Sequence, residues 1–187
     1  CLINNKFAKD NQGRVVFYHW NGMVARGLIS DGLWYYSMDS GDGHYLGRFK
    51  AAGVAPSDTY QLQVLDLVNE ERLSRNIAPL KLNEQVQQAA QVRAGEISTV
   101  FDHIRPDGRS CFTALDEYVT DGYGTAGENI AAGQSSPQEV VNDWMNSPGH
   151  RANILKESYT ALGVGYYYGS GPYYCYWVQM FIGDRYW

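Results

Sequence analysis

The hydrophobic pattern of this chain changes its period near residue 57, and this change constrains the fold more than any other feature. Before it, short aromatic or β-branched runs alternate with Asn-Gly and Asp-Gly pairs, which favour tight hairpin turns. After it, apolar residues recur at helical spacing, and the end of the chain returns to strand-like runs. Helices on both sides of central strands predict a layered arrangement of helices on a sheet.

Two helices are predicted in the first half of the helical region. The first starts at residue 58, has an apolar face and stops near Asn76. Asn83 is a candidate N-cap for the second helix, because its side chain can accept hydrogen bonds from the first free backbone N–H groups. The positions of the second helix that are expected to face inward are Val86, Ala89, Ala90, Arg93, Ala94 and Ile97.

Ser136 begins the strongest local signature in the chain. It can cap a helix, Pro137 fits the first helical position, and Glu139 completes a capping box. Farther on, residues 161–168 and the run from Tyr173 to Ile182 flank a Gly-Ser-Gly-Pro turn. That pattern predicts an antiparallel hairpin at the end of the chain.

The composition also shifts near Pro56. Residues 1–56 carry six basic and four acidic side chains, whereas the whole chain has a net charge of -5. We therefore predict two parts: residues 1–56, a small β-rich N-terminal segment with wall-binding-like hairpins or a cleft cap, and residues 57–187, the main domain. The acidic balance argues against a nucleic-acid partner, which needs a basic face. No apolar run reaches the roughly 20 residues of a transmembrane segment.

Three cysteines leave one thiol to explain. An arbitrary boundary explains a chain that begins with Cys1, and the alternative is a lipid anchor on a processed lipoprotein. Cys111 and Cys175 could pair if the protein is exported, since disulfides persist in oxidising compartments.

Two histidines and one carboxylate are candidates for chemistry. His103 lies in a tight turn after the second helix, His150 in a break between two helical pieces, and Glu128 at the start of an apolar strand-like run. Such a set could hold a zinc-type ion or move a proton. The alternative is that each polar group only caps its own loop.

Five motifs occur in an order that resembles the CAP superfamily, also called SCP/PR-1-like or cysteine-rich secretory protein domains, in its bacterial form. They are residues 69–72 (Asn-Glu-Glu-Arg), 103–108 (His-Ile-Arg-Pro-Asp-Gly), 127–131 (Gly-Glu-Asn-Ile-Ala), 144–155 (Trp-Met-Asn-Ser-Pro-Gly-His-Arg-Ala-Asn-Ile-Leu) and 176–181 (Tyr-Trp-Val-Gln-Met-Phe). The resemblance covers residues 58–183. It implies an α+β fold with a three-layer α-β-α sandwich, an extracellular or cell-surface location, and an open cleft with two histidines and acidic residues.

The resemblance also implies the residues of that cleft. His103 and His150 match the two cleft histidines, Glu128 matches the glutamate of the Gly-Glu-Asn motif, and Asn129 follows it. Eukaryotic members carry a further glutamate where this chain has Ser147. The implied metal ligands are His103 and His150 with Glu128 nearby, for zinc or another divalent metal, and the loss of the second glutamate weakens such a site.

Other motif residues are expected to be structural. Arg105 is expected to pair with Asp107 and brace the turn after His103. Asn153 is expected to anchor the loop that presents His150. Large tryptophans in strand and helix motifs, such as Trp144, are expected in the core. A row of tyrosines along the last hairpin could stack on sugars or lipid chains, or be ordinary sheet composition.

Three functions remain open from the sequence. The first is a secreted, non-enzymatic binding module whose cleft accepts a lipid, peptide or cell-wall-derived ligand, favoured because no nucleophile has a base beside it. The second is a metal-dependent, peptidase-like hydrolase that uses His103, Glu128 and His150. The third is a surface adhesion protein that docks to wall polymer through residues 1–56.

Overall fold

The computed structural model describes residues 5–31, 34–50 and 59–185. The chain forms two compact units, one of Cys1–Pro56 with Leu73–Pro79 and one of Ser57–Arg72 with Leu80–Trp187. The two interpretations of Cys1 fall outside the described residues.

The first unit is built from short strands in two antiparallel sheets. The strands are β1 (Lys6–Lys9) and β2 (Val15–Tyr18) in one sheet, and β3 (Gly27–Ser30), β4 (Trp34–Met38) and β5 (Tyr45–Lys50) in the other. Tyr36, Met38 and Leu73 form a small core. The β-rich N-terminal segment predicted from the hairpin signals is therefore confirmed.

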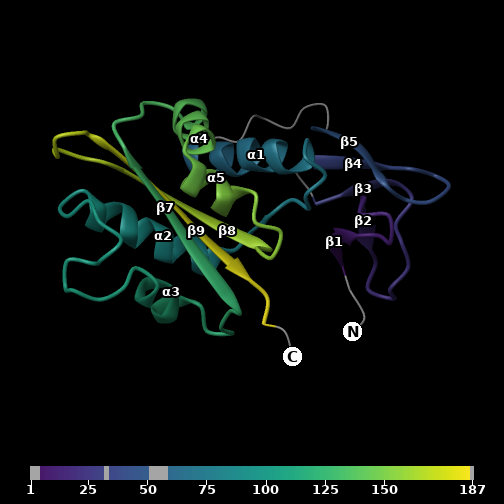
Figure 1. Cartoon of the computed structure of the whole chain (residues 1–187), viewed down its shortest axis with the longest axis horizontal. Coiled ribbons are helices and arrows are strands. Elements are labelled where there is room, and N and C mark those ends of the chain that lie inside the picture. Colours follow the sequence, from purple (N-terminus) through teal and green to yellow (C-terminus); the bar gives the residue numbers. More distant parts are fainter. Residues whose placement is uncertain (1–4, 32–33, 51–58, 186–187) are drawn as a thin grey trace. The chain divides into compact units, whose positions relative to one another are not determined.

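The second unit is a four-stranded sheet with helices on both faces (Figure 1). Its strands lie in the order β6 (Lys81–Leu82), β8 (Ala161–Tyr168), β9 (Cys175–Gly183) and β7 (Thr125–Ala132). Its helices are α1 (Tyr60–Leu73), α2 (Glu84–Ile97), α3 (Thr113–Tyr118), α4 (Pro137–Asn146) and α5 (Pro148–Ile154). β9 pairs antiparallel with both β7 and β8, and β6 pairs parallel with β8.

The alternation of side chains along β9 creates two cores, one on each face of the sheet. Trp177 and Phe181 pack with residues of α1, α4 and α5. Val178 and Met180 point to the other face and pack with α2 and α3. Figure 1 shows the same division of the helices. The three-layer α-β-α sandwich is confirmed.

Helix α2 packs very closely on β8. Asn83 caps it as predicted, accepting hydrogen bonds from the backbone N–H groups of the two residues that follow Glu84. The six positions expected to face inward are all buried. A Cβ atom at Gly165 would overlap the carbonyl of Ala90, and one at Gly163 would overlap the backbone near Val86. Glycine in β8 is therefore what lets helix and strand approach.

The capping box of α4 differs in one contact from the prediction. Ser136 Oγ accepts a hydrogen bond from the Glu139 backbone N–H at 3.2 Å, and Pro137 occupies the first turn. The Glu139 carboxylate instead accepts from the backbone N–H and hydroxyl of Ser135, at 2.8 and 2.9 Å. It reaches one residue farther back than a standard box.

The final hairpin forms as predicted, but its second strand starts at Cys175 rather than Tyr173. Tyr174 has a φ of 59°, a left-handed conformation that interrupts the extended backbone. The turn is thus longer than its Gly-Ser-Gly-Pro sequence indicates.

Cys111 and Cys175 are both free thiols in the structure, so the disulfide that the sequence allowed does not form. Cys111 lies near Glu128, which pairs with Met180 on β9. Met180 is five residues from Cys175, a distance of about 16 Å along a strand. Cys175 therefore starts β9 well away from the part of the strand that lies beside Glu128, whereas a disulfide requires Cα atoms within roughly 7 Å.

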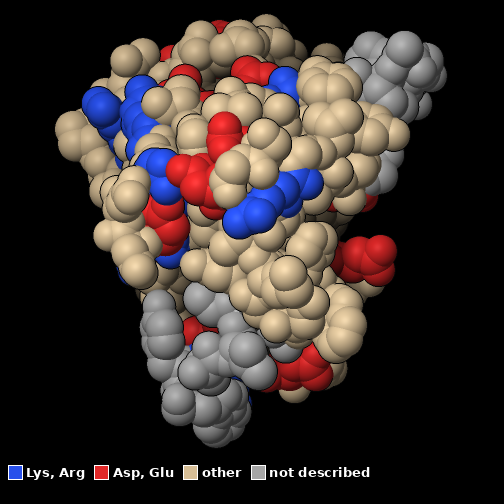
Figure 2. Space-filling model, turned by 90° about the vertical axis from the view of Figure 1, so that its right-hand side faces the viewer, with Lys and Arg blue, Asp and Glu red and all other residues tan. Residues whose placement is uncertain are grey.

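Both signs of charge occur on the surface. Basic and acidic side chains lie side by side on the face drawn in Figure 2, without an uninterrupted basic area. Among the described residues, no helix combines the length and apolar character that crossing a bilayer requires.

Candidate functional site

A cavity of about 440 Å³ lies in the second unit, beside the middle of β7. The loop after α2, the segment that leads into α3, the strand β7 and the region after α5 all contribute to it. Its lining residues are His103, Ile104, Ser110, Cys111, Phe112, Ala126, Gly127, Glu128, Asn153, Lys156 and Tyr159.

Glu128 is the buried acid of this cavity, with 1% of its side chain exposed. Its carboxylate accepts a hydrogen bond from Arg93 Nε at 2.8 Å and a longer one from Arg93 Nη2 at 3.3 Å. It also accepts from His103 Nδ1 at 2.8 Å. Glu128 is therefore engaged by one arginine and one imidazole at the same time.

Arg93 links Glu128 to two further groups. Its side chain is fully buried, pairs with Glu96 at 2.7 Å and donates to the carbonyl oxygen of Asp102 at 2.7 Å. Sequence reasoning placed Arg93 on the inward face of its helix but gave it no role. The available signal was a charged residue within a row of small apolar ones, because a buried arginine needs an acidic partner.

His103 is the exposed end of the same network. Its side chain is 56% exposed, and its Nδ1 is fixed by Glu128. The hydrogen bond to Glu128 raises the pKa of His103 above its ordinary value. Nε2 is the ring nitrogen that remains for a ligand.

His150 behaves in the opposite way. Burial lowers its pKa, and the positive charge of His103 lowers it further. His150 lies within helix α5 rather than in the expected break between two helical pieces, and Asn129 donates to its carbonyl oxygen at 3.1 Å. Asn153 in turn donates to the Asn129 side-chain oxygen at 2.9 Å and to the Glu128 carbonyl at 3.2 Å.

The structure thus brings together some of the five predicted cleft residues. His103 and Glu128 line the cavity and touch each other. His150 lies near enough to His103 to feel its charge but does not line the cavity, and Asn129 is buried behind it. Ser147 is the residue between α4 and α5 and does not line the cavity either.

Comparison with known proteins identifies the family of the chain. The model of the CAP family (Cysteine-rich secretory protein family) matches residues 65–181. The chain belongs to the CAP family. The uncharacterized protein YkwD of Bacillus subtilis (strain 168) is 41% identical over 133 residues, which are 69% of this chain and 50% of that protein.

Further CAP relatives extend the comparison. The uncharacterized membrane protein YlbC of Bacillus subtilis is 33% identical over 109 residues, 57% of this chain and 31% of that protein. The chain thus spans half or less of each curated relative's length.

Among the solved structures that share the fold, two have a TM-score of 0.61 each. An extracellular protein containing a SCP domain from Bacillus anthracis is 21% identical and covers 98% of this chain and 68% of that one. An outer surface protein from Borrelia burgdorferi is 18% identical and covers 71% of this chain and 97% of that one.

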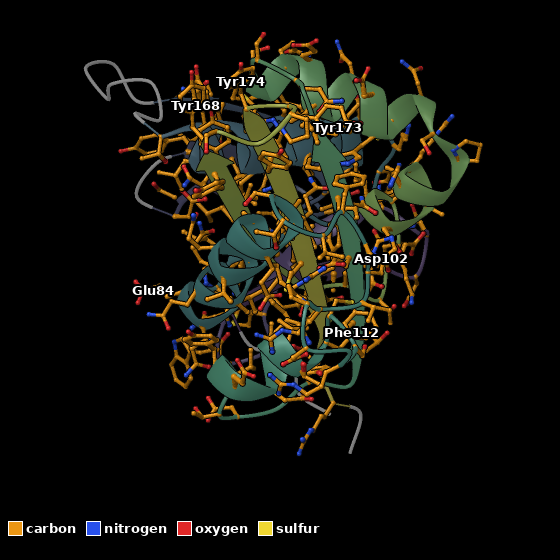
Figure 3. All side chains as sticks on the ribbon, turned by 90° about the vertical axis from the view of Figure 1, so that its left-hand side faces the viewer. Glu84, Asp102, Phe112, Tyr168, Tyr173 and Tyr174 are labelled. Carbon is orange, nitrogen blue, oxygen red and sulfur yellow. The ribbon has the colours of Figure 1, made fainter. Side chains whose placement is uncertain are left out.

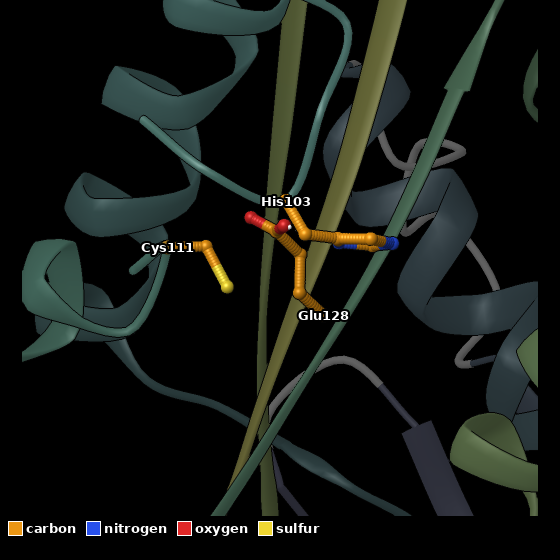
Figure 4. Close-up of side chains that lie close together, drawn as sticks. All are labelled: His103, Cys111 and Glu128. Carbon is orange, nitrogen blue, oxygen red and sulfur yellow. Dashed lines mark hydrogen bonds and ion pairs between the residues drawn. The ribbon is translucent and has the colours of Figure 1, made fainter. Parts of the chain in front are cut away.

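Cys111 is a neighbour of the CAP-domain site that sequence reasoning did not place there. Its thiol faces Glu128 and His103 in Figure 4, and one ligand atom from each of the three residues lies within 4.8 Å of the others. Burial, followed by the negative charge of Glu128, raises the pKa of Cys111 to about 12. The thiol is therefore protonated at neutral pH and is not an activated nucleophile.

These contacts do not fit a divalent cation bound directly by Glu128. The buried guanidinium of Arg93 already neutralises that carboxylate and would repel a second cation nearby. The metal ligands implied by the resemblance then reduce to the imidazoles of His103 and His150, fewer than the three or four protein ligands typical of zinc. Zinc binding through these two histidines stays a prediction, which calorimetric titration of wild type and His103→Ala can test.

The loop of His103 is braced by contacts other than the predicted one. Arg105 does not pair with Asp107: it pairs with Glu96 at 2.6 Å and with Glu117 at 2.7 Å. Asp107 pairs instead with Arg109 at 2.7 Å. The expectation was wrong because the hydrogen-bonded turn points Arg105 inward, where it is 6% exposed, while Asp107 stays at the surface.

Proposed function

We propose that this CAP domain is a non-enzymatic extracellular binding module whose cavity accepts a ligand with an anionic group and an apolar body. One observation carries the proposal: Arg93 holds Glu128, and Glu128 holds a half-exposed His103 at the cavity. The raised pKa of His103 favours its protonated form, which donates a charge-assisted hydrogen bond to an anion.

The other cavity residues support a ligand of this kind. Lys156 supplies a second cation, and its Nζ lies 4.6 Å above the ring of Tyr159. Ile104 and Phe112 lie in the chain segment between α2 and α3 and supply apolar surface to the cavity. A cavity with apolar walls and a few placed polar groups is typical of small-molecule sites.

The same residues argue against catalysis by an activated nucleophile. The Glu128 carboxylate is committed to Arg93 and His103, and the Cys111 thiol is protonated. A nucleophile needs a neighbouring group that removes its proton. A binding role requires neither an activated nucleophile nor a neighbouring base.

The proposed location rests on the relatives. The Bacillus anthracis protein is described as extracellular, and the Borrelia burgdorferi protein is an outer surface protein. Either a lipid or a peptide ligand would be available in an extracellular location.

Matched probes test the proposal. We expect the protein to bind oleate but not oleyl alcohol if the natural ligand is a lipid, and a tripeptide of alanine and leucine with a free but not an amidated C-terminus if it is a peptide. His103→Gln should weaken the binding of the anionic probe about 10- to 100-fold, the range for a lost charged hydrogen bond. Isothermal titration calorimetry measures both.

Arg109→Gln is the matched control, because Arg109 is an exposed cation of the same loop that does not line the cavity. It should leave probe binding unchanged. Equal affinity of the charged and neutral probes, or unchanged binding by His103→Gln, would contradict the proposal.

A second candidate function is supported by one observation. The pKa of His103 is raised while that of the nearby His150 is lowered. Two titratable groups shifted in opposite directions can serve as acid and base, as a peptidase-like hydrolase requires. Hydrolysis of a diverse peptide library that is abolished by both His103→Ala and His150→Ala would favour this function, and absence of hydrolysis by wild type would remove it.

A further inference from the structure

A group of exposed aromatic rings lies at the tip of the β8–β9 hairpin, which we call the tyrosine patch. It consists of Phe101, Tyr167, Tyr168, Tyr173 and Tyr174, with exposures of 38% to 68%. Figure 3 shows Tyr168, Tyr173 and Tyr174 at the same end of the hairpin. None of these residues lines the site cavity or belongs to the network of Arg93, Glu128 and His103.

The rings of the patch form two groups, each arranged by contact between its own members. Tyr168 and Tyr174 stack with centroids 6.5 Å apart and an interplanar angle of 28°. Tyr173 lies 6.5 Å from Phe101 and 6.3 Å from Tyr176. Tyr176 is buried and also contacts Tyr167, so it anchors Tyr167 and Tyr173 on the sheet.

The backbone at the tip is strained in a way that a simple turn does not need. Tyr174 has a φ of 59°, which is uncommon for a bulky residue and is usually occupied by glycine or asparagine. The turn contains two glycines, yet this positive φ falls on the tyrosine. Strain that keeps a large ring exposed points to a use for that ring.

The charge around the patch restricts what it can bind. Residues 158–183 contain no Asp, Glu, Lys or Arg, although the chain has 35 such residues in total. The hairpin that carries four of the five patch rings therefore supplies no cation of its own, whereas interfacial membrane segments combine apolar residues with Lys or Arg. Exposed phenol rings instead offer apolar faces together with hydroxyl groups.

We propose that the tyrosine patch is a binding surface for an uncharged glycan chain. The apolar faces of sugar rings stack on the tyrosine rings, and sugar hydroxyls hydrogen-bond to the phenols. This surface is independent of the function proposed for the cavity.

Chitohexaose, an uncharged oligomer of N-acetylglucosamine, is the probe, and calorimetry with the full chain is the measurement. Tyr168→Ala should weaken binding about tenfold, as expected when a ring contact of this kind is lost. Tyr174→Gly should weaken binding similarly but raise the melting temperature, because glycine adopts a positive φ without strain. A merely structural tyrosine would not give weaker binding together with higher stability.

Three controls make the outcome decisive. His103→Gln should bind the glycan as wild type does, which separates this surface from the cavity. Trp20→Ala removes an exposed ring of the first unit, 72% exposed, and should also leave binding unchanged. Absence of binding by wild type, unchanged binding by Tyr168→Ala and Tyr174→Gly, or loss of binding in Trp20→Ala would overturn the proposal. Patch-dependent binding to phosphatidylcholine vesicles without glycan binding would overturn it in favour of a membrane contact.

Discussion

Arg93 and Glu128 form an ion pair in which 0% and 1% of the two side chains are exposed, with Nε 2.8 Å from Oε2. Removing one partner of such a pair leaves a buried charge without compensation. We therefore expect Arg93→Met to lower the free energy of unfolding by about 3–5 kcal/mol. Urea denaturation at neutral pH measures this loss.

The double variant Arg93→Met with Glu128→Gln is the control for that prediction. It removes both charges, so it should be more stable than Arg93→Met alone. If Glu128→Gln lowers the free energy of unfolding by the same amount in the Arg93→Met protein as in wild type, the two charges are not coupled.

The pH dependence of stability follows from His103. Since its pKa is raised in the folded protein above the ordinary 6.5, the folded state binds the proton more tightly than the unfolded state. The His103 contribution to stability is therefore fully present below about pH 6.5 and is lost as the pH rises through the folded pKa. Urea denaturation across this range should show a decline that His103→Gln removes, and an identical decline in the variant would assign it to another group.

The close packing of α2 on β8 predicts the effect of a single methyl group. Gly165→Ala places a Cβ against the Ala90 carbonyl, so it should destabilise the protein by about 1–3 kcal/mol. Gly95→Ala lies in α2 with open space around its Cβ, so it should stabilise the protein by about 0.5–1 kcal/mol. Thermal unfolding of both variants measures the sign of each change in stability. If Gly95→Ala destabilises the protein and Gly165→Ala does not, the described packing of α2 on β8 is contradicted.

The two described cysteines should differ in reactivity. Cys111 is 4% exposed with a pKa raised to about 12, while Cys175 is half-buried beside the Tyr166 hydroxyl at 3.5 Å. Iodoacetamide should modify Cys175 first in the folded protein and both at similar rates in urea. Peptide mapping by mass spectrometry follows each site, and faster labelling of Cys111 would contradict its environment.

The layers of the fold could be predicted because local signals set them. Asn83 and Ser136 cap their helices through contacts within a few residues, and the hairpin at the end of the chain is a local pairing. Helical and strand periodicity then assign an inner face to each element. These interactions are short in sequence, so the pattern contains them.

The details of the site could not be predicted in the same way. The motif indicated His103 and Glu128, but the partner of Glu128 is Arg93, 35 residues earlier in another layer. The expected pairing of Arg105 with Asp107 was wrong for a related reason, since sequence proximity does not give side-chain direction. Charge partners depend on tertiary packing, which periodicity does not describe.

The central claim is that Glu128, fixed by Arg93, raises the pKa of His103 at the cavity, and NMR titration of the imidazoles tests it most directly. In wild type we expect a His103 pKa above the ordinary 6.5 and a His150 pKa below it. Glu128→Gln should return the His103 pKa toward 6.5. A wild-type His103 pKa at or below 6.5, or one that Glu128→Gln leaves unchanged, would contradict the account.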